Sequence, residues 1–157
     1  MEFIKYEPSF DHLIKQYYLS EEQMRYTAAP IDCIPLSNED SDRHSILAIH
    51  ENELVTFFVL HESEGVKPYS DNENAILLRA FSTNNRHQGK GYAKQALNLL
   101  PQYIQNTFLN INEIVLAVNV QNKPAQGLYE KAGFIDQGIR RMGPKGELII
   151  MHYSLDA

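Results

Sequence analysis

A short basic, glycine-rich stretch is the part of the chain whose residue types and spacing point most directly to chemistry. It reads Arg86-His87-Gln88-Gly89-Lys90-Gly91-Tyr92-Ala93 and lies between an apolar run at 75–81 and a long amphipathic run at 91–108. Backbone N–H groups at a helix start point the same way and meet the positive end of the helix dipole, so such a place binds phosphate. The glycines let a ligand approach the main chain closely, and Arg86 and Lys90 add positive charge. The stretch therefore predicts a phosphate-binding turn.

Two common phosphate-binding motifs do not fit this turn. A P-loop has four residues between its glycines, followed by Lys-Ser or Lys-Thr, and that spacing is absent here. A dinucleotide fingerprint needs a third small residue three positions after Gly91, where Lys94 stands, and an acid at the end of the next strand, where Asn119 stands. A third interpretation is a turn that holds the pyrophosphate arm of coenzyme A.

A second block begins about 30 residues further on and reads Asn122-x-x-Ala125-x-x-Leu128-Tyr129-Glu130-Lys131-x-Gly133-Phe134. The first block, Arg86-x-x-Gly89-x-Gly91, resembles the Gln/Arg-x-x-Gly-x-Gly/Ala signature of the GCN5-related N-acetyltransferase (GNAT) superfamily. The second resembles that superfamily's Asn-x-x-Ala-x-x-Leu-Tyr-x-x-x-Gly-Phe block, and the strand between them falls where the family has its fifth strand. The resemblance covers residues 75–134 of the 157. The N-terminal half is similar to the family in element order only.

The resemblance implies an acetyltransferase that uses acetyl-coenzyme A as co-substrate. In the family, two neighbouring parallel strands splay apart and the pantetheine arm lies between them; here these are 75–81 and 114–119. Backbone groups near the end of the first strand pair with the pantetheine, the amides of 88–92 hold the pyrophosphate, and Asn122 contacts the arm while it caps its helix. Arg86 either reaches a phosphate or is a solvated loop charge. The resemblance thus assigns cofactor binding to Phe81, Thr83, Arg86, Gln88, Gly89, Lys90, Gly91, Tyr92 and Asn122.

Tyr129 is the candidate catalytic residue, because the matching tyrosine of the family points at the coenzyme sulfur. Attack of an amine on the thioester produces a tetrahedral oxyanion, which a backbone N–H near 79–81 would stabilise. Collapse expels a thiolate, to which the phenol of Tyr129 would donate a proton. The helical pattern alone favours a core aromatic at this position; the family match reverses that preference.

The general base is left open by the sequence. An alkyl ammonium has a pKa of about 10.4 and must lose a proton before it attacks. The family often uses a carboxylate that acts through water, and Glu53, Glu62 and Glu73 lie near strand ends, although each can equally be a solvated charge. Residues 75–81 contain no acid, so a water wire or an acceptor that arrives deprotonated is the alternative.

No metal site is expected, because the six histidines have no ligand spacing and Cys33 is the single cysteine. We expect His87 to be exposed beside the phosphates and His152 to be structural.

The acceptor pocket is expected between the N-terminal helices and the loops at 27–36 and 61–72. The segment 17–30 is rich in Tyr, Glu and Met, which would give an aromatic and acidic lining for a cation. This organisation is similar to the bacterial polyamine acetyltransferases of the superfamily, so spermidine or spermine is one candidate; other small amines, amino acids, antibiotics and protein N-termini stay open. A coenzyme-binding sensor without turnover is a further alternative, against which the intact Tyr129 argues. The family also suggests a homodimer through the C-terminal strands.

The elements that position these residues follow from hydrophobic periodicity and from turn signals. Helices are predicted at 9–19, from Ser20 with a capping box at Gln23, at 91–108 and from Asn122 to Gly133. Strands are predicted at 3–6, 45–49, 53–60, 75–81, 114–120, 134–139 and 148–155, and residues 30–42 are predicted to be loop. Pro101 costs roughly 3 kcal/mol inside a helix, so we expect a kink or short break near 97–100. The order predicts an α/β fold: a central mixed, mostly antiparallel sheet with one parallel β-α-β crossover and helices on both faces.

Length and composition are consistent with one globular domain over residues 1–157. Hydrophobic residues make up 43% and the net charge is −6, which argues against nucleic acid or an anionic membrane as a partner. No apolar run approaches the ~18–20 residues of a membrane span. The first eight residues carry three charges and do not form a signal peptide, so we expect a cytoplasmic protein with a small-molecule amine acceptor.

Overall fold

The computed structural model describes residues 1–155, in which seven strands form one sheet and five α-helices cover it. The strands are β1 Glu2–Lys5, β2 Arg43–His50, β3 Glu53–His61, β4 Ala75–Thr83, β5 Glu113–Asn119, β6 Ile135–Gly143 and β7 Gly146–Ser154. The helices are α1 Asp11–Gln16, α2 Glu21–Met24, α3 Pro30–Glu39, α4 Tyr92–Thr107 and α5 Lys123–Lys131. Short 3-10 turns lie at Pro8–Phe10, Ser63–Gly65 and Asn85–His87.

The sheet runs in the order β1-β2-β3-β4-β5-β7-β6, and within residues 1–155 its only parallel neighbours are β4 and β5. Parallel strands need a long crossover connection, and α4 provides it here. The predicted mixed, mostly antiparallel sheet with one parallel crossover is confirmed.

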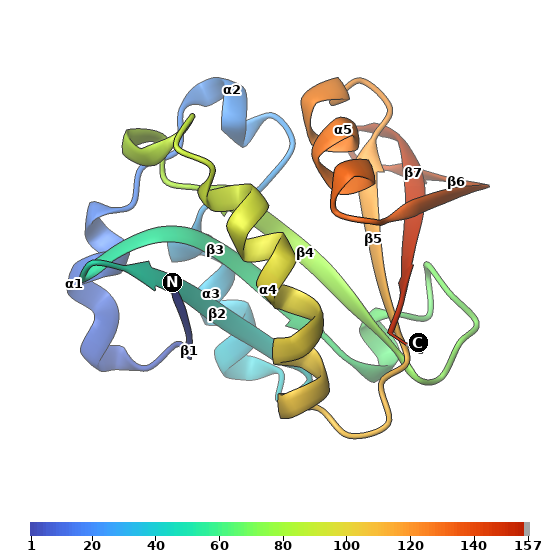
Figure 1. The fold of residues 1–157 in the computed structure, drawn as a ribbon, viewed down its shortest axis with the longest axis horizontal. Helices are drawn as coiled ribbons and strands as arrows, with labels where there is room; N and C mark the ends of the chain where they lie inside the picture. The colour runs from blue at the N-terminus through green and yellow to red at the C-terminus, as the bar shows by residue number, and fades with distance from the viewer. Residues whose placement is uncertain (156–157) are drawn as a thin grey trace.

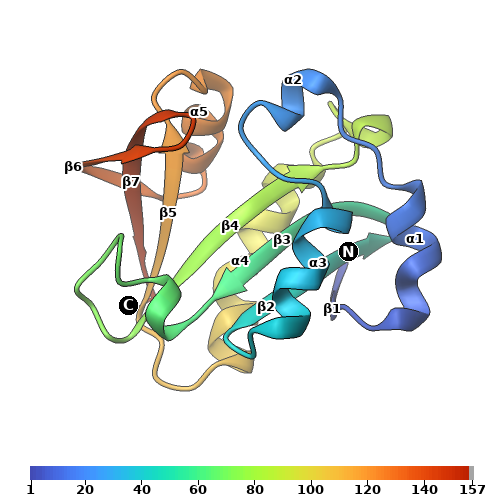
Figure 2. The ribbon, with the colours of Figure 1, turned by 180° about the vertical axis from the view of Figure 1, so that it is seen from behind.

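Helices lie on both faces of this sheet, as Figure 1 and the reverse view in Figure 2 show. On one face α4 and α5 pack over the main core, because successive strand side chains alternate between faces and one set points toward each layer. This core includes Leu97, Leu100 and Ile104 of α4 with Ile76, Leu78, Ile114 and Leu116 of β4 and β5. On the other face α1 and α3 cover a second cluster, which includes Ile14, Cys33, Ile34, Leu47, Phe57 and Val59.

The prediction of a loop at 30–42 is wrong, because α3 occupies most of it. Pro30 stands in the first helical turn, where its missing N–H breaks no hydrogen bond. Cys33 and Ile34 are buried against the sheet. Tertiary burial therefore stabilises a helix in a segment of poor intrinsic propensity that contains a further proline, Pro35.

Two other helices differ in detail from the prediction. The helix expected at 9–19 is a 3-10 turn at Pro8–Phe10 followed by α1, which ends at Gln16. Helix α4 continues without a break through Pro101, because its apolar stripe is buried on both sides of that residue, at Leu97, Leu100 and Ile104. The predicted capping box of α2 is confirmed: Ser20 accepts from the Gln23 N–H, and the Gln23 side chain accepts from the Ser20 N–H. None of the helices described is long and apolar enough to cross a membrane.

Candidate active site

Strands β4 and β5 separate halfway along their length. Their parallel pairing runs from Ala75 opposite Glu113 to Leu78 opposite Leu116, and the register within residues 1–155 contains no pair beyond that point. Figure 1 shows the two strands diverging toward the end where α4 and α5 begin. The splay expected from the family resemblance is therefore present, and it leaves backbone groups of both strands without a strand neighbour on that side.

A β-bulge in β4 lies where the splay begins. Val59 of β3 pairs with Arg79 and Phe57 pairs with Ser82, so Ala80 and Phe81 together stand opposite a single β3 residue. Ala80 has φ +54°, a left-handed conformation that costs a non-glycine residue about 1 kcal/mol or more. Bulges re-aim the chain and disrupt the ladder locally. This one turns the main chain of 80–81 at the place where the sequence predicted an oxyanion donor.

The glycine-rich turn after β4 leads directly into α4. Gly89 and Gly91 have φ of +78° and +83°, and Gly91 is the residue that precedes the first turn of α4. A Cβ at either position would meet no atom within 4 Å, so the backbone conformation, not crowding, requires glycine there. Residues 88–91 and Arg86 are exposed. Open amides at a helix start, with two cations beside them, fit a pyrophosphate group.

The prediction that His87 is exposed is wrong, since only 7% of its surface is accessible. Its ring packs edge-on against Tyr92 with centroids 5.8 Å apart, its Nδ1 lies 3.3 Å from Lys90 Nζ, and its Nε2 lies 3.6 Å from a Glu53 oxygen. The ring thus lies beneath the turn that holds Lys90. This contact also places Glu53, one of the candidate bases, beside the turn.

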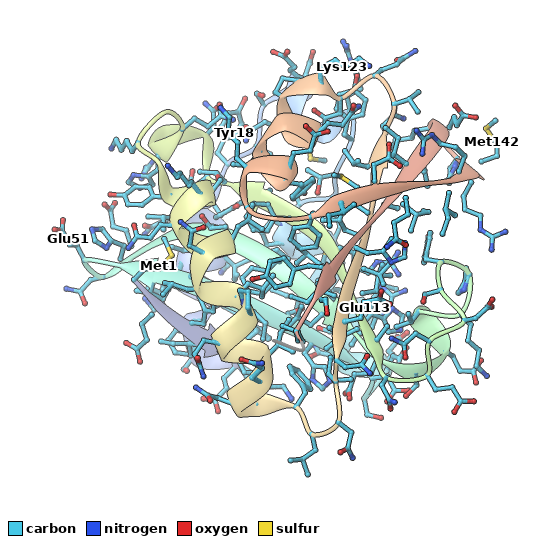
Figure 3. The ribbon with its side chains drawn as sticks, turned by 45° about the vertical axis from the view of Figure 1, so that its right-hand side comes forward. Met1, Tyr18, Glu51, Glu113, Lys123 and Met142 are labelled. Carbon is cyan, nitrogen blue, oxygen red and sulfur yellow. The ribbon has the colours of Figure 1, made fainter. Side chains whose placement is uncertain are left out.

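Helix α5 begins and ends as the sequence predicted. The Asn122 side-chain oxygen accepts from the Ala125 N–H at 3.3 Å, and Gly133 takes the left-handed conformation, with φ +104°, after the helix. Figure 3 places Lys123, the first residue of α5, at the opposite end of β5 from Glu113, where the strand begins. Asn122 therefore lies at the splayed end of the two strands, the end at which α4 also begins.

Tyr129 projects from α5 into an aromatic cluster at the splay. Its ring meets Phe81 of the bulge at 6.1 Å and Phe134 at 5.9 Å, both edge to face. The side chain is buried, and burial raises the pKa of the phenol. Its hydroxyl makes no hydrogen bond to any other residue of the described chain. The phenol is therefore protonated at neutral pH, and its O–H group is available as a hydrogen-bond donor.

One of the residues assigned to the cofactor has its carbonyl already engaged. The Gln23 side chain of α2 donates to the Thr83 carbonyl at 2.7 Å, and Thr83 pairs with Thr56 of β3. Phe81 has no partner in the β3 register and none in the β5 register among residues 1–155. Backbone pairing with pantetheine was predicted at Phe81 and Thr83. Of these two residues, Phe81 is therefore the one whose backbone groups have no strand partner.

A cavity of about 350 Å³ lies at the splay, on the side of the sheet that carries α3. The two segments from which the sequence predicted an acceptor pocket, 27–36 and 61–72, contribute Thr27, Ala28, Cys33, Leu36 and Tyr69 to its wall. The rest of the wall is Tyr26, Arg43, Val59, Leu77, Leu78, Arg79, Ala80, Ala117, Asn119, Pro144, Lys145 and Leu148.

The expected acidic lining is wrong: the cavity wall formed by the described residues contains three cations and no carboxylate. Glu21 and Glu22 occupy the exposed first turn of α2, where they interact favourably with the helix dipole. Glu62 is 2.6 Å from His44 Nε2, and Glu73 belongs to a separate surface hollow at 63–75. None of the three candidate bases lines the cavity.

The sequence prediction missed four features: the bulge at Ala80, the cations Arg43 and Arg79, and the β6–β7 hairpin as a cavity wall. One signal was present, because Arg79 is the single charged residue in the apolar run 75–81. The hairpin pairs with β5 through β7, and its turn makes two further hydrogen bonds: Lys145 Nζ donates to the Met24 carbonyl at 3.1 Å, and Asn119 Nδ2 donates to the Lys145 carbonyl at 2.9 Å. His152, predicted to be structural, is buried in β7 with Nδ1 at 3.2 Å from Glu113.

Across residues 1–155, no three His, Cys, Asp or Glu side chains gather as metal ligands would.

Comparison with known proteins identifies the family from which this geometry comes. The profile of the Acetyltransferase (GNAT) family matches residues 8–134. The chain is 38% identical over 151 residues to the uncharacterized N-acetyltransferase YbbJ of Bacillus subtilis, a match that covers 96% of this chain and 94% of the relative. It is 44% identical over 52 residues, 33% of this chain and 30% of the relative, to the spermidine N(1)-acetyltransferase of Vibrio cholerae. Among solved structures, the aminoglycoside acetyltransferase AAC(6')-Ib in complex with coenzyme A superimposes with a TM-score of 0.76 at 16% identity, over 97% of this chain and 93% of that one.

Proposed function

This chain belongs to the GNAT family of acetyltransferases, and we propose that it transfers the acetyl group of acetyl-coenzyme A to the primary amine of a small molecule. The observation that carries the proposal is the arrangement of two half-sites around the splay. On the α4 and α5 side lie the glycine turn, Asn122 and Tyr129; on the α3 side lies the cavity, whose wall includes Leu78, Ala80 and Ala117. The two meet where β4 and β5 have no pairing.

The residues on the α4 side fit the coenzyme. The exposed turn 88–91, with Lys90 and Arg86, suits the pyrophosphate; the bulge at Phe81 leaves main-chain groups for the pantetheine amides; and Asn122, whose oxygen caps α5, retains its side-chain N–H₂ for the arm. The bound coenzyme supplies the activated acetyl thioester. The solved relative in complex with coenzyme A supports this assignment, since it shares the fold.

Two groups of the chain would act on the reacting atoms. A main-chain N–H of the bulge, at Ala80 or Phe81, would stabilise the oxyanion that forms when the amine attacks, because the bulge holds the backbone there independently of the substrate. Tyr129, protonated and in ring contact with Phe81, would donate its proton to the departing thiolate.

Removal of the proton from the acceptor would not need a carboxylate in the cavity. Arg43 and Arg79 disfavour a neighbouring ammonium, because like charges lower its pKa. The neutral, nucleophilic form of the amine is therefore favoured at the site, and water can carry the proton away.

The first experiment measures thiol release from acetyl-coenzyme A across a panel of amines, with Tyr129→Phe alongside. Turnover on an amine that the substitution lowers strongly would support the proposal. Coenzyme binding without turnover on any amine would instead favour the alternative of a coenzyme-binding sensor.

We also propose that the chain forms a homodimer through its C-terminal strands. β6 is an edge strand whose residues are exposed almost throughout, including Ile135, Ile139 and Met142, and Figure 3 shows Met142 at the outer tip of the hairpin. Light scattering of the purified protein tests this: a mass near 18.0 kDa would contradict it, and twice that would support it.

A further inference from the structure

We propose that the acceptor amine carries a carboxylate and that Arg79 binds it. The inference rests on the proposed function, and it narrows the acceptor from small amines in general to amino carboxylates of the size of an amino acid. It follows from the charge, the partners and the position of Arg79 in the cavity.

The cavity is cationic although the protein as a whole is acidic. The described residues that form its wall include Arg43, Arg79 and Lys145 but no Asp or Glu. The whole chain, in contrast, has 20 acidic and 14 basic residues. Arg43 Nε lies 3.8 Å from Asp40, whereas Arg79 and Lys145 have no carboxylate partner among residues 1–155. A polyamine, which carries only positive charge, would be repelled by this wall.

Arg79 is half-buried and has no carboxylate partner within residues 1–155. Within the described residues its guanidinium makes one hydrogen bond, from Nη1 to His61 Nδ1 at 3.2 Å. The nearby carboxylate, Asp40, is already engaged, with His61 Nε2 at 3.3 Å and Arg43 Nε at 3.8 Å. A guanidinium has five N–H donors, so Arg79 retains most of them for a ligand.

The His61 ring fixes this arrangement. Burial lowers the pKa of His61, so the ring is neutral at pH 7 and its two nitrogens differ: Nε2–H donates to Asp40, and Nδ1 accepts from Arg79. His61 therefore holds the guanidinium without neutralising it. A cation that is partly removed from water and left unneutralised is costly, and an anionic ligand offsets that cost.

Arg79 is also correctly placed along the chain. It directly precedes Ala80 of the bulge, and both residues line the same cavity. A carboxylate on the Arg79 guanidinium would therefore leave the amine of a compact molecule free to reach the splay. The volume of about 350 Å³ lies at the small end of the range for ligand pockets, which suits a molecule of amino-acid size.

The experiment compares matched acceptors that differ only in the carboxylate. Free amino acids and ω-amino acids are paired with their primary amides, and spermidine and putrescine form the polyamine arm; thiol release gives kcat/KM for each. A charge-assisted, two-pronged hydrogen bond predicts a kcat/KM at least about tenfold higher for the best amino carboxylate than for its amide. The variant Arg79→Gln should remove this preference, and Arg79→Lys should restore part of it.

Controls separate this inference from the proposed function and from misfolding. Arg140→Gln removes an exposed arginine of β6 that is paired with Asp136, and it should leave the preference unchanged. The Kd for acetyl-coenzyme A, measured by calorimetry, should be the same in Arg79→Gln and in the parent protein. Equal or better turnover of the amides or the polyamines would overturn the carboxylate inference while the acetyltransferase function stands. Absence of thiol release with every amine would overturn both.

Discussion

The ring of Tyr129 stands edge-on to the ring of Phe81, with centroids 6.1 Å apart, beside the point where β4 and β5 separate. Tyr129 comes from the second sequence block and Phe81 from the strand before the first block. Their contact therefore joins the side of the splay that carries the glycine turn to the bulge that borders the cavity. We expect different roles for the hydroxyl and the ring of Tyr129, and substitution can separate these roles.

Tyr129→Phe should lower kcat by about 10²-fold or more, because general acid catalysis contributes about 10²–10⁴-fold. The aromatic contacts with Phe81 and Phe134 are kept, so the melting temperature and the Kd for acetyl-coenzyme A should change little. Steady-state thiol release and calorimetry measure these quantities. Tyr103→Phe is the matched control, since Tyr103 is a partly buried tyrosine that packs on Phe3 at the β1 end of the sheet. An unchanged kcat in Tyr129→Phe would remove the phenol from the mechanism.

Gly91→Ala should weaken acetyl-coenzyme A binding and destabilise the protein by about 1–2 kcal/mol, because φ is +83° at this position and a Cβ there is strained. Gly127→Ala in α5 is the control: no atom lies within 4 Å of its added Cβ, and alanine in a helix interior is about 0.5–1 kcal/mol better than glycine. Chemical denaturation and calorimetry should therefore show opposite changes in stability for the two variants. A Gly91→Ala protein with parental coenzyme affinity would argue against the turn as the pyrophosphate site.

The sequence was enough to predict the sheet and its parallel crossover, because glycines, helix caps and apolar periodicity are local signals. The cavity on the α3 side could not be predicted in the same way. Its wall is assembled from α3, the segment around Tyr69 and the β6–β7 hairpin, which lie far apart in sequence and meet only in the folded chain. The prediction of an acidic lining was wrong because Glu21 and Glu22 lie in the first turn of α2, where they interact with the helix dipole and do not point into the cavity. His87 was misplaced for a similar reason, since only tertiary packing against Tyr92 buries it.

Ala80→Gly should keep the bulge and leave stability unchanged or raise it by up to about 1 kcal/mol, because glycine adopts the φ of +54° without a Cβ clash. Ala80→Val should destabilise the protein and lower kcat, since a β-branched residue resists positive φ and would straighten the strand. Thermal unfolding and thiol-release kinetics are compared for the two variants. If Ala80→Val retained parental kcat, the bulge would not position the oxyanion donor.

Acidification should weaken acceptor binding through His61. The folded-state pKa of His61 is lowered by burial, so below its ordinary value of about 6.5 the unfolded chain binds more protons than the folded one. Stability is therefore complete above about pH 6.5 and declines as the pH falls below it. When the pH falls to the lowered folded-state pKa, protonation of His61 removes the Nδ1 acceptor that orients Arg79, so KM for the acceptor should rise there while the Kd for acetyl-coenzyme A stays constant.

His61→Gln tests this account, because a glutamine side chain can accept from Arg79 but does not titrate. The variant should show a flatter dependence of KM on pH in the acid range where His61 of the folded parent is protonated, with a kcat at neutral pH close to that of the parent. His12→Gln provides the control, since His12 lies on the exposed side of α1, away from the cavity. A His61→Gln protein with the parental pH profile would show that another group, such as the acceptor amine itself, governs the acid limb. In that case Arg79 would have to be held in place by the cavity wall and not by the His61 ring.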